Sequence, residues 1–292
     1  MIIVTGATGK LGRMIVEGLL KNTSPDQIGV SVRDPEKASD LQERGVRVRK
    51  GDFGDGESLR HALEGASQVL IVSSNSAGAS AVELHRSAIE AAKVSGAQRI
   101  LYTSHMGSNP NSHFAPMRDH AATEEILKTS GVAFTSLRNG FYAESGLMLL
   151  GDALQTGTFT APEDGPVSWT THADLAEAMV IALTEEGRLD GLTAALTAAE
   201  ALDLNALAEI ASKLNGREIK RVTVTDEEYR ASMIARGVPE MWANLSVGLF
   251  AASRNGEFAA VDPMLENLLR RPAISMEEFL GSRISKPMQS LQ

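Results

Sequence analysis

A glycine-rich turn stands almost at the start of the chain, directly behind a short apolar run. Residues 5–12 read TGATGKLG, with glycine at positions 6, 9 and 12, and they follow the apolar residues 2–4. Apolar side chains then recur at helical spacing between residues 11 and 20. A strand, a tight glycine turn and an amphipathic helix in this order predict the first unit of a doubly wound α/β sheet.

Glycine in such a turn has a physical purpose. A phosphate reaches the backbone N–H groups of a helix N-terminus only where no Cβ blocks it, and the helix dipole favours the anion. We therefore expect Gly6 to make the turn, Gly9 to admit the pyrophosphate of a dinucleotide, and Gly12 to let the helix pack on the strand. The spacing G-x-x-G-x-x-G departs from the usual G-x-G-x-x-G, so the prediction depends more on the position of the turn.

Strand and helix patterns alternate along the first half of the chain. Short β-branched runs occupy residues 2–5, 28–32, 46–50, 68–72, 99–103 and 132–137, with helical patterns between them at 35–44, 58–63, 80–95 and 119–129. This alternation predicts a Rossmann-type, doubly wound parallel sheet that binds its ligand at the carboxyl ends of the strands.

The second half of the chain has a looser pattern. We expect a dinucleotide-binding Rossmann domain at residues 1–138 and a smaller, substrate-binding C-terminal α/β lobe at 139–292 over the cofactor cleft, with helices at 204–214 and 226–236. Part of this half should return to the main sheet at Trp169 and Thr170, followed by a helix that Asp174 caps.

Composition excludes several other classes of protein. The 292 residues include 28 Lys plus Arg and 37 Asp plus Glu, a formal charge of -9 without a basic stripe, which argues against a nucleic-acid partner. Cysteine is absent, and His105, His113 and His120 lack the spacing of a metal site, so we expect no metal. No apolar stretch approaches the roughly 20 residues that span a bilayer, and no signal-peptide pattern is present, which predicts a cytoplasmic protein without a membrane partner.

The residues behind the second and third strand runs bear on which dinucleotide binds. Arg33 comes first after the run 28–32, and its planar, permanently charged guanidinium suits the 2′-phosphate of NADP. The alternative is a solvated Arg33, with Asp34 holding the ribose of NAD. Asp52 is placed to meet the adenine, although an aspartate in a Gly-Asp loop is commonly a turn former.

Further motifs follow in order along the chain. They are VRDPEKA at 32–38, GDF at 51–53, Ser73-Ser74, HAATEEIL at 120–127 and LRNGFY at 137–142. Together with the glycine turn they resemble the NmrA-like branch of the atypical short-chain dehydrogenase/reductases, and within it the type 2 NAD(P)H:quinone oxidoreductases and the triphenylmethane reductases. The resemblance covers nearly the whole chain. It implies an NADPH-dependent oxidoreductase, monomeric or homodimeric, that transfers hydride to a quinone or another delocalised aromatic acceptor. The alternative is an NmrA-like regulator that senses NADP(H) without catalysis.

The resemblance also implies roles for individual residues. It places Gly6, Thr8, Lys10, Leu11 and Arg33 around the phosphates, in addition to Gly9 and Gly12. It places Asp52 and Phe53 at the adenine, and Ser73, with Ser74 beside it, near the ribose. The residues that it places at the nicotinamide are Thr103, Asn139, Gly140, Phe141 and Tyr142.

One departure from the superfamily concerns catalysis. Classical members carry Tyr-x-x-x-Lys, whose tyrosine protonates a carbonyl oxygen, and the corresponding stretch here runs from His120 to Glu124. By its charge a glutamate raises the pKa of a neighbouring acid, so simple ketone reduction is disfavoured. A quinone or an extended cation spreads the developing charge and needs only a weaker acid. His120 and Asn139 are the expected catalytic residues, with His120 a proton or hydrogen-bond donor or else structural.

Overall fold

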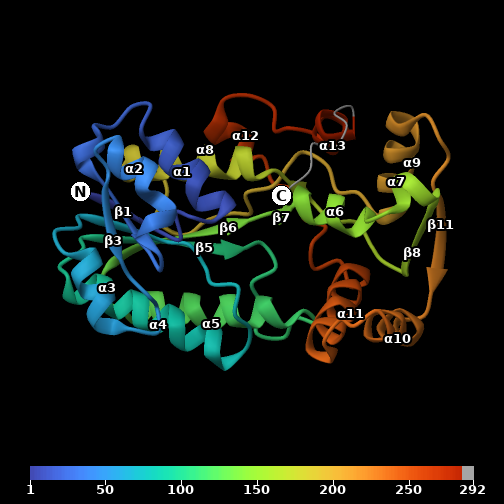
Figure 1. Ribbon diagram of the computed structural model, residues 1–292, viewed down its shortest axis with the longest axis horizontal. Coiled ribbons are helices and arrows are strands. Elements are labelled where there is room, and N and C mark those ends of the chain that lie inside the picture. The colour runs from blue at the N-terminus through green and yellow to red at the C-terminus, as the bar shows by residue number, and fades with distance from the viewer. Residues whose placement is uncertain (285–292) are drawn as a thin grey trace. The chain divides into compact units, whose positions relative to one another are not determined.

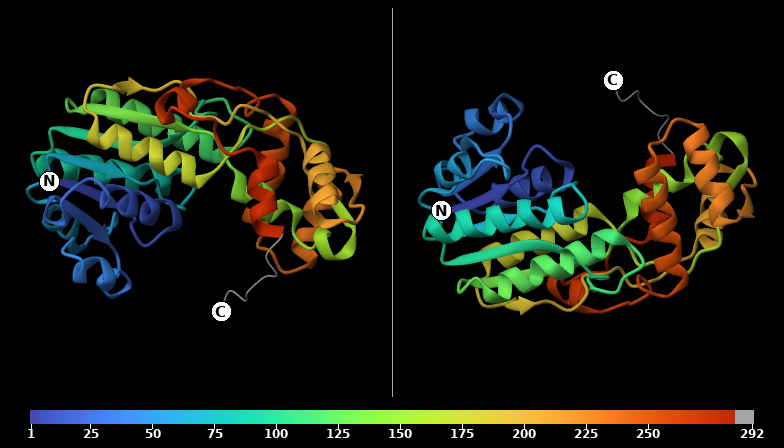
Figure 2. Two further views of the ribbon diagram at one scale, coloured as in Figure 1. Left: turned by 90° about the horizontal axis from the view of Figure 1, so that it is seen from above. Right: turned by 90° about the horizontal axis from the view of Figure 1, so that it is seen from below.

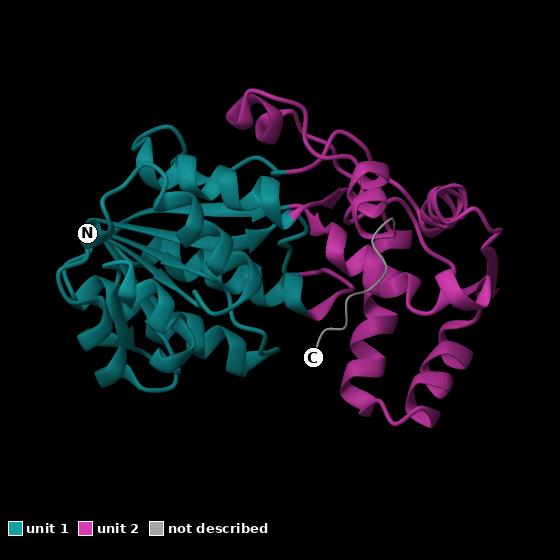
Figure 3. Ribbon diagram, turned by 45° about the horizontal axis from the view of Figure 1, so that its top comes forward, with its two compact units in different colours: residues 1–110, 116–139, 172–196 teal, residues 111–115, 140–171, 197–292 magenta. Residues whose placement is uncertain are grey.

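The computed structural model describes residues 1–284, and these residues form two compact units (Figure 3). Unit 1 comprises residues 1–110, 116–139 and 172–196, and unit 2 comprises residues 111–115, 140–171 and the described residues from 197 onward. The chain therefore leaves unit 1 after Asn139 and returns to it at His172. The expected division into a cofactor-binding domain at 1–138 and a substrate-binding lobe at 139–292 stays a prediction, because compactness does not show what each part binds.

Unit 1 is built on one seven-stranded sheet in which neighbouring strands pair in parallel. Its strands are β1 (Ile2–Thr5), β2 (Ile28–Val32), β3 (Arg47–Lys50), β4 (Gln68–Ile71), β5 (Arg99–His105), β6 (Ala133–Asn139) and β10 (Gly191–Leu192). They lie in the order β10-β6-β5-β4-β1-β2-β3. The strands β2 and β3 are therefore added on one side of β1 and the strands β4, β5 and β6 on the other, so the strand order reverses between β1 and β4. The predicted doubly wound fold is confirmed, and its ligand crevice is expected where the order reverses.

Helices cover both faces of this sheet (Figures 1 and 2). On one face lie α1 (Lys10–Leu19) and α8 (His172–Thr184), and on the other lie α3 (Gly56–Leu63), α4 (Ala79–Val94) and α5 (Ala115–Thr129). The short η1 (Pro25–Gln27), η2 (Pro35–Ala38) and α2 (Ser39–Glu43) connect the outer strands. Burial of the strands on both faces explains their continuous apolar runs, since β2 and β4 are buried throughout.

Unit 2 contains two small parallel sheets and seven helices among its described residues. In one sheet β7 (Phe141–Tyr142) pairs with β9 (Trp169–Thr170), and in the other β8 (Thr158–Pro162) pairs with β11 (Lys220–Val224). The helices are α6 (Ala143–Leu150), α7 (Ala153–Thr156), α9 (Leu204–Asn215), α10 (Asp226–Ala235), α11 (Glu240–Arg254), α12 (Met264–Leu269) and α13 (Met276–Ile284).

Two expectations about the second half of the chain were wrong. Trp169 and Thr170 do not return to the main sheet, because they pair with β7, and the return is made instead by β10 against β6. Asp174 does not precede its helix as a cap, since it is the third residue of α8 and is fully buried.

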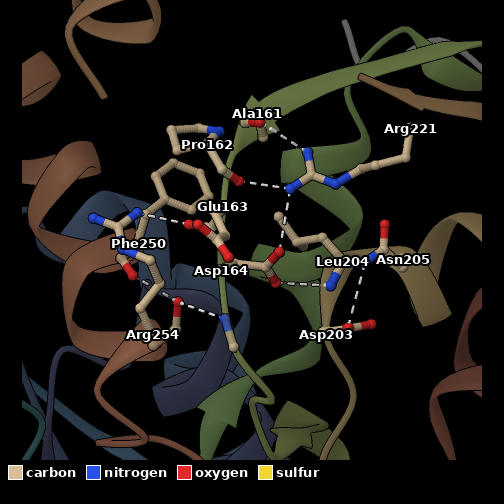
Figure 4. Close-up of polar contacts among 12 residues, drawn as sticks. Ala161, Pro162, Glu163, Asp164, Asp203, Leu204, Asn205, Arg221, Phe250 and Arg254 are labelled. Atoms are coloured by element: carbon tan, nitrogen blue, oxygen red, sulfur yellow. Dashed lines mark hydrogen bonds and ion pairs between the residues drawn. The ribbon is translucent and has the colours of Figure 1, made fainter. Parts of the chain in front are cut away.

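A buried ion pair fixes the segment after β8 within unit 2 (Figure 4). Arg221 donates to two carbonyls at the end of β8 and to Asp164 at 3.1 Å, and the other carboxylate oxygen of Asp164 accepts from the backbone N–H of Leu204 at 2.8 Å. Burial raises the pKa of Asp164, against the effect of these donors. Arg254 pairs with Asp226 and also donates to the carbonyl of Glu163. The segment after β8 is therefore bound by both Arg221 and Arg254. Within residues 1–284, none of the helices is long and apolar enough to span a bilayer.

Candidate cofactor and active site

The turn between β1 and α1 is closed by short backbone contacts. Gly6 has a φ of +63°, a conformation that side chains disfavour, and its N–H donates to the carbonyl of Ser31 on β2 at 3.1 Å. A Cβ at Gly12 would lie 2.8 Å from the carbonyl carbon of Gly6 and closer still to the oxygen, so only glycine permits this approach of helix and strand. Gly9 takes an extended conformation at the helix N-cap.

The N-terminus of α1 differs from those of several other helices in the described chain. Its N-cap residue, Gly9, provides no side-chain cap, and its first turn holds no acidic residue. By contrast, Asp55 caps α3, Asp203 caps α9 and Thr225 caps α10. The first N–H groups of a helix have no partner within the helix, so an N-terminus without a side-chain cap, as at α1, favours an anion.

A cleft of about 520 Å³ opens beside this turn, within the size range of small-molecule sites. It is lined from the carboxyl ends of β1, β2, β3 and β4, which is the expected edge of the sheet. Eight of the residues assigned to the cofactor line it: Gly6, Thr8, Gly9, Arg33, Asp52, Phe53, Ser73 and Ser74. Sequence reasoning did not assign the others: Ser31, Val32, Gly51, Val72, Asn75, Ser76 and Leu84.

The structure distinguishes Arg33 from its neighbour Asp34. Arg33 is exposed and makes no hydrogen bond or ion pair with any residue in the described part of the chain. Asp34 is already engaged, since its carboxylate accepts from the N–H of Glu36 at 3.3 Å, capping η2, and lies 3.7 Å from the ammonium of Lys37. These contacts favour Arg33 over Asp34 as the residue that meets the cofactor ribose.

Other assigned residues lie behind the cleft or do not line it. Leu11 and Gly12 are buried in the packing of α1, whereas Lys10 is exposed at its first position. Thr103 is buried on β5, where its hydroxyl accepts from the Ser73 N–H at 2.8 Å and donates to the Ser73 hydroxyl at 3.1 Å. Thr103 therefore fixes the end of β4.

Asp52 serves the loop in which it stands. Its carboxylate accepts from the N–H of Gly54 at 2.9 Å, the geometry of an aspartate turn, and its own N–H donates to the hydroxyl of Ser58. Because Asp52 also lines the cleft, the turn places it where it can meet a ligand as well.

Asn139, the last residue of β6, is fully buried with an unsatisfied side chain. Neither the amide oxygen nor the amide nitrogen has a hydrogen-bond partner among residues 1–284. Leaving one such buried polar atom unpaired costs about 1–3 kcal/mol, so unpaired groups of this kind are uncommon away from functional sites. Residues 140–142 follow directly in unit 2, where Phe141 packs its ring against Phe258 and Trp169.

His120 lies on α5 against β5. Its Nδ1 is 2.7 Å from the hydroxyl oxygen of Tyr102, and its ring stacks on His105 at a centroid distance of 6.2 Å. Burial, assisted by the nearby His85, lowers the pKa of His120 to about 3. The ring is therefore neutral at physiological pH.

Glu124, one turn after His120, is held by many donors. It accepts from the hydroxyls of Ser104, Ser108 and Ser136 at 2.8–3.0 Å and forms two bonds with the guanidinium of Arg138 at 3.0 and 2.7 Å. Burial alone would raise the pKa of Glu124, but the bonds from Arg138 and the hydroxyls outweigh it and lower the pKa. Glu124 is therefore an ionised structural centre between β5, α5 and β6.

The remaining histidine considered for a metal lies in unit 2. His113 makes contacts with Glu257 through its ring, at 2.6 Å, and through its backbone N–H, at 3.1 Å. Within residues 1–284 no three His, Cys, Asp or Glu side chains are grouped so that they could hold a metal ion. A function without metal stays a prediction.

Comparisons with known proteins agree with this arrangement. A family model described as NAD(P)H-binding matches residues 6–186. Quinone oxidoreductase 2 of Escherichia coli strain K12 is 33% identical over 282 residues, which cover 96% of this chain and 98% of that protein. The crystal structure of the NADPH-dependent quinone oxidoreductase of Escherichia coli with NADPH has a TM-score of 0.92 at 31% identity and covers 98% of this chain and 100% of that one. The crystal structure of triphenylmethane reductase of Citrobacter sp. with NADP(H) has a TM-score of 0.89 at 29% identity and covers 97% of this chain and 100% of that one.

Proposed function

The chain belongs to the NAD(P)H-binding, NmrA-like family, and from this premise we propose that it transfers hydride from NADPH to a quinone or to a delocalised dye-like acceptor. It is an NAD(P)H-dependent oxidoreductase. The observation that carries the proposal is the cleft beside the uncapped N-terminus of α1, lined in part by Arg33, which has no ion-pair partner among the described residues. When bound, the nicotinamide would supply a hydride, that is, one proton together with two electrons, from its C4 carbon.

Residues of unit 1 are suited to hold such a cofactor. The N-terminus of α1, which has no side-chain cap, suits the pyrophosphate, and Gly6 and Gly9 leave the approach open. Arg33 suits the 2′-phosphate of NADPH, because its guanidinium has no ion pair to break within the described chain. Asp52 and Phe53 are proposed at the adenine, and Ser73 and Ser74 near the ribose, all four within the lining of the same cleft.

The acceptor end is proposed at the carboxyl ends of β5 and β6. The unsatisfied amide of Asn139 suits a ligand or an ordered water, and the neutral ring of His120 offers a hydrogen-bond donor rather than a strong acid. Hydride transfer to a quinone gives a hydroquinone monoanion, whose charge is delocalised, and one proton from water completes the hydroquinone. A triarylmethane cation takes the hydride on its central carbon and needs no proton. A simple ketone would give a strongly basic alkoxide and is a poor match.

A non-catalytic NADP(H) sensor is not favoured, because the similar proteins reported above are named an oxidoreductase and a reductase. The deciding experiment follows NADPH oxidation with a quinone, a triarylmethane dye and a simple ketone. The quinone and the dye should support oxidation of NADPH, and the ketone should not. Deuterium placed at C4 of NADPH should appear on the central carbon of the reduced dye. Tight NADPH binding without oxidation by any quinone or dye would contradict the proposal and favour the sensor.

A further inference from the structure

We propose that the hydroxyl of Ser31 is a further cofactor-binding group, which forms a hydrogen bond with the adenosine half of NADPH. Gly51 acts as a positioning residue, because its lack of a side chain leaves room for this hydroxyl. Both residues belong to the part of the cleft lining that sequence reasoning did not assign. The inference rests on the position of the adenosine proposed above and on contacts within unit 1 alone.

Ser31 is a buried polar residue near the carboxyl end of β2. It lines the cleft, only 2% of its surface is exposed, and its Oγ has no hydrogen-bond partner among residues 1–284. A buried hydroxyl without a partner costs free energy, so such groups are uncommon away from functional sites. The packing of unit 1 therefore gives no reason for a serine at this position.

Other hydroxyl groups at the same edge of the sheet are used by the fold. Thr5 pairs in register with Ser31 across β1 and β2, and its hydroxyl accepts a backbone N–H from the segment after β4 at 2.9 Å. The hydroxyl of Thr103 donates to that of Ser73 at 3.1 Å. In the described part of the chain, the buried hydroxyls without a partner are those of Ser31 and Ser74, and both residues line the cleft. This coincidence points to a ligand rather than to the fold.

Gly51 provides the space that the hydroxyl occupies. It stands directly after β3, and a Cβ at this position would lie 2.1 Å from Oγ of Ser31 and 3.0 Å from Cβ of Ala62 on α3. A side chain at Gly51 would therefore displace the hydroxyl from its place. The same segment continues into Asp52 and Phe53, the residues proposed at the adenine. The unpaired hydroxyl thus lies beside the segment that is proposed to meet the adenosine.

The chemistry of a serine hydroxyl suits this ligand. A hydroxyl both donates and accepts, and adenosine carries acceptors in its ring nitrogens and donors in its amino group and ribose. Serine has three χ1 rotamers, so rotation about one bond moves the oxygen towards a ligand without moving the backbone. The nucleotide would give the hydroxyl the partner that it lacks, and one neutral hydrogen bond changes a Kd by about two- to tenfold.

The test measures binding and stability of the same variant. Calorimetric titration of Ser31→Ala with NADPH and with adenosine 2′,5′-bisphosphate, the adenosine half of the cofactor, should show both Kd values raised by about two- to tenfold. Urea unfolding of the nucleotide-free variant should have a midpoint equal to or above that of the unmodified protein, because an unpaired buried group is removed. An unchanged Kd for either nucleotide, or a lower midpoint, would overturn the inference, since a hydroxyl that serves the fold gives those results.

Ser130→Ala is the matched control. Its hydroxyl is also buried, but it donates to the carbonyl of Leu127 at 2.7 Å and lies outside the cleft lining, so the midpoint should fall and both Kd values should stay unchanged. Gly51→Ala should weaken binding in the unmodified protein and weaken it little further in Ser31→Ala, whereas an equal loss in both would contradict the role of Gly51. Failure of the proposed function would appear separately, as NADPH binding without oxidation by a quinone or dye, and would leave these binding measurements decisive.

Discussion

Replacing Arg33 with serine should weaken the binding of NADPH and leave the binding of NADH nearly unchanged. Arg33 lines the cleft at the carboxyl end of β2, is exposed, and has no ion-pair partner among the described residues. The substitution therefore leaves no buried charge behind and breaks no contact of the fold. What it removes is the paired, charge-assisted hydrogen bonding that a guanidinium offers to a 2′-phosphate.

The size of the effect follows from this exposure. A hydrogen bond to a charged group contributes about 1.5–3 kcal/mol, which corresponds to a factor of about 10–150 in Kd. Because Arg33 is exposed, salt screens the interaction over a Debye length of about 8 Å at physiological ionic strength. We therefore expect a loss of about 10–30-fold for NADPH under those conditions, and a larger loss at low salt.

Calorimetric titration of both nucleotides at low and high salt measures the effect. Arg60→Ser is the matched control, because it removes the same charge from an exposed position on α3 outside the cleft lining. Asp34→Ala tests the alternative and should change NADH binding little, since Asp34 is engaged by Glu36 and Lys37. An unchanged ratio of the two Kd values in Arg33→Ser, or a selective loss of NADH in Asp34→Ala, would refute the reasoning.

Further expected outcomes concern stability and metal. Gly12→Ala should lower the free energy of unfolding by about 1–3 kcal/mol in urea titrations, because its Cβ meets the backbone of Gly6; Gly56→Ala, whose Cβ meets only the end of a flexible arginine, should cost much less. Glu124→Gln should cost about 3 kcal/mol by removing the charge of a buried carboxylate from its pair with the partly buried Arg138, whereas Glu125→Gln on the exposed side should cost little. The folded pKa of Glu124 lies below its ordinary value of 4.5, so its contribution is present above that pH and is lost as the pH falls through the folded pKa. Unfolding at a series of pH values should show the difference between wild type and Glu124→Gln shrinking on acidification, and a constant difference would count against the ionised state. Dialysis against EDTA should leave NADPH binding and turnover unchanged, and a stoichiometric metal that restores lost activity would contradict this.

The main sheet was predictable from the sequence because its strands are buried on both faces. Such strands are continuous apolar runs, and the six predicted runs lie within two residues of the observed strands at both ends. The two-residue strands β7 and β10 escaped prediction because they are too short to show periodicity. Trp169 was assigned to the wrong sheet for the same reason, since two residues cannot indicate which partner strand they meet.

The site was predictable where a residue type has a chemical reason to be there. Gly6, Arg33 and Ser73 combine a suitable group with a position at a strand end, and all three line the cleft. Val72 and Gly51 also lie at strand ends, but they contribute backbone and surface rather than a diagnostic functional group. The contact of Tyr102 with His85 and His120 depends on how α4 and α5 pack against β5, and neither spacing nor composition predicts it.

His120 and Glu124 lie one helical turn apart on α5 and are held in opposite states by their surroundings. Glu124 is kept ionised because Arg138 and three hydroxyls donate to it, and these donors offset its charge locally. His120 is kept neutral because burial and then His85 lower its pKa, and these effects outweigh Glu124, which acts in the opposite direction. The stretch that holds Tyr-x-x-x-Lys in classical relatives therefore offers neither a strong acid nor a free positive charge here. Such a site is matched to an acceptor that can take hydride before it is protonated, and this is the chemical property that quinones and triarylmethane cations share.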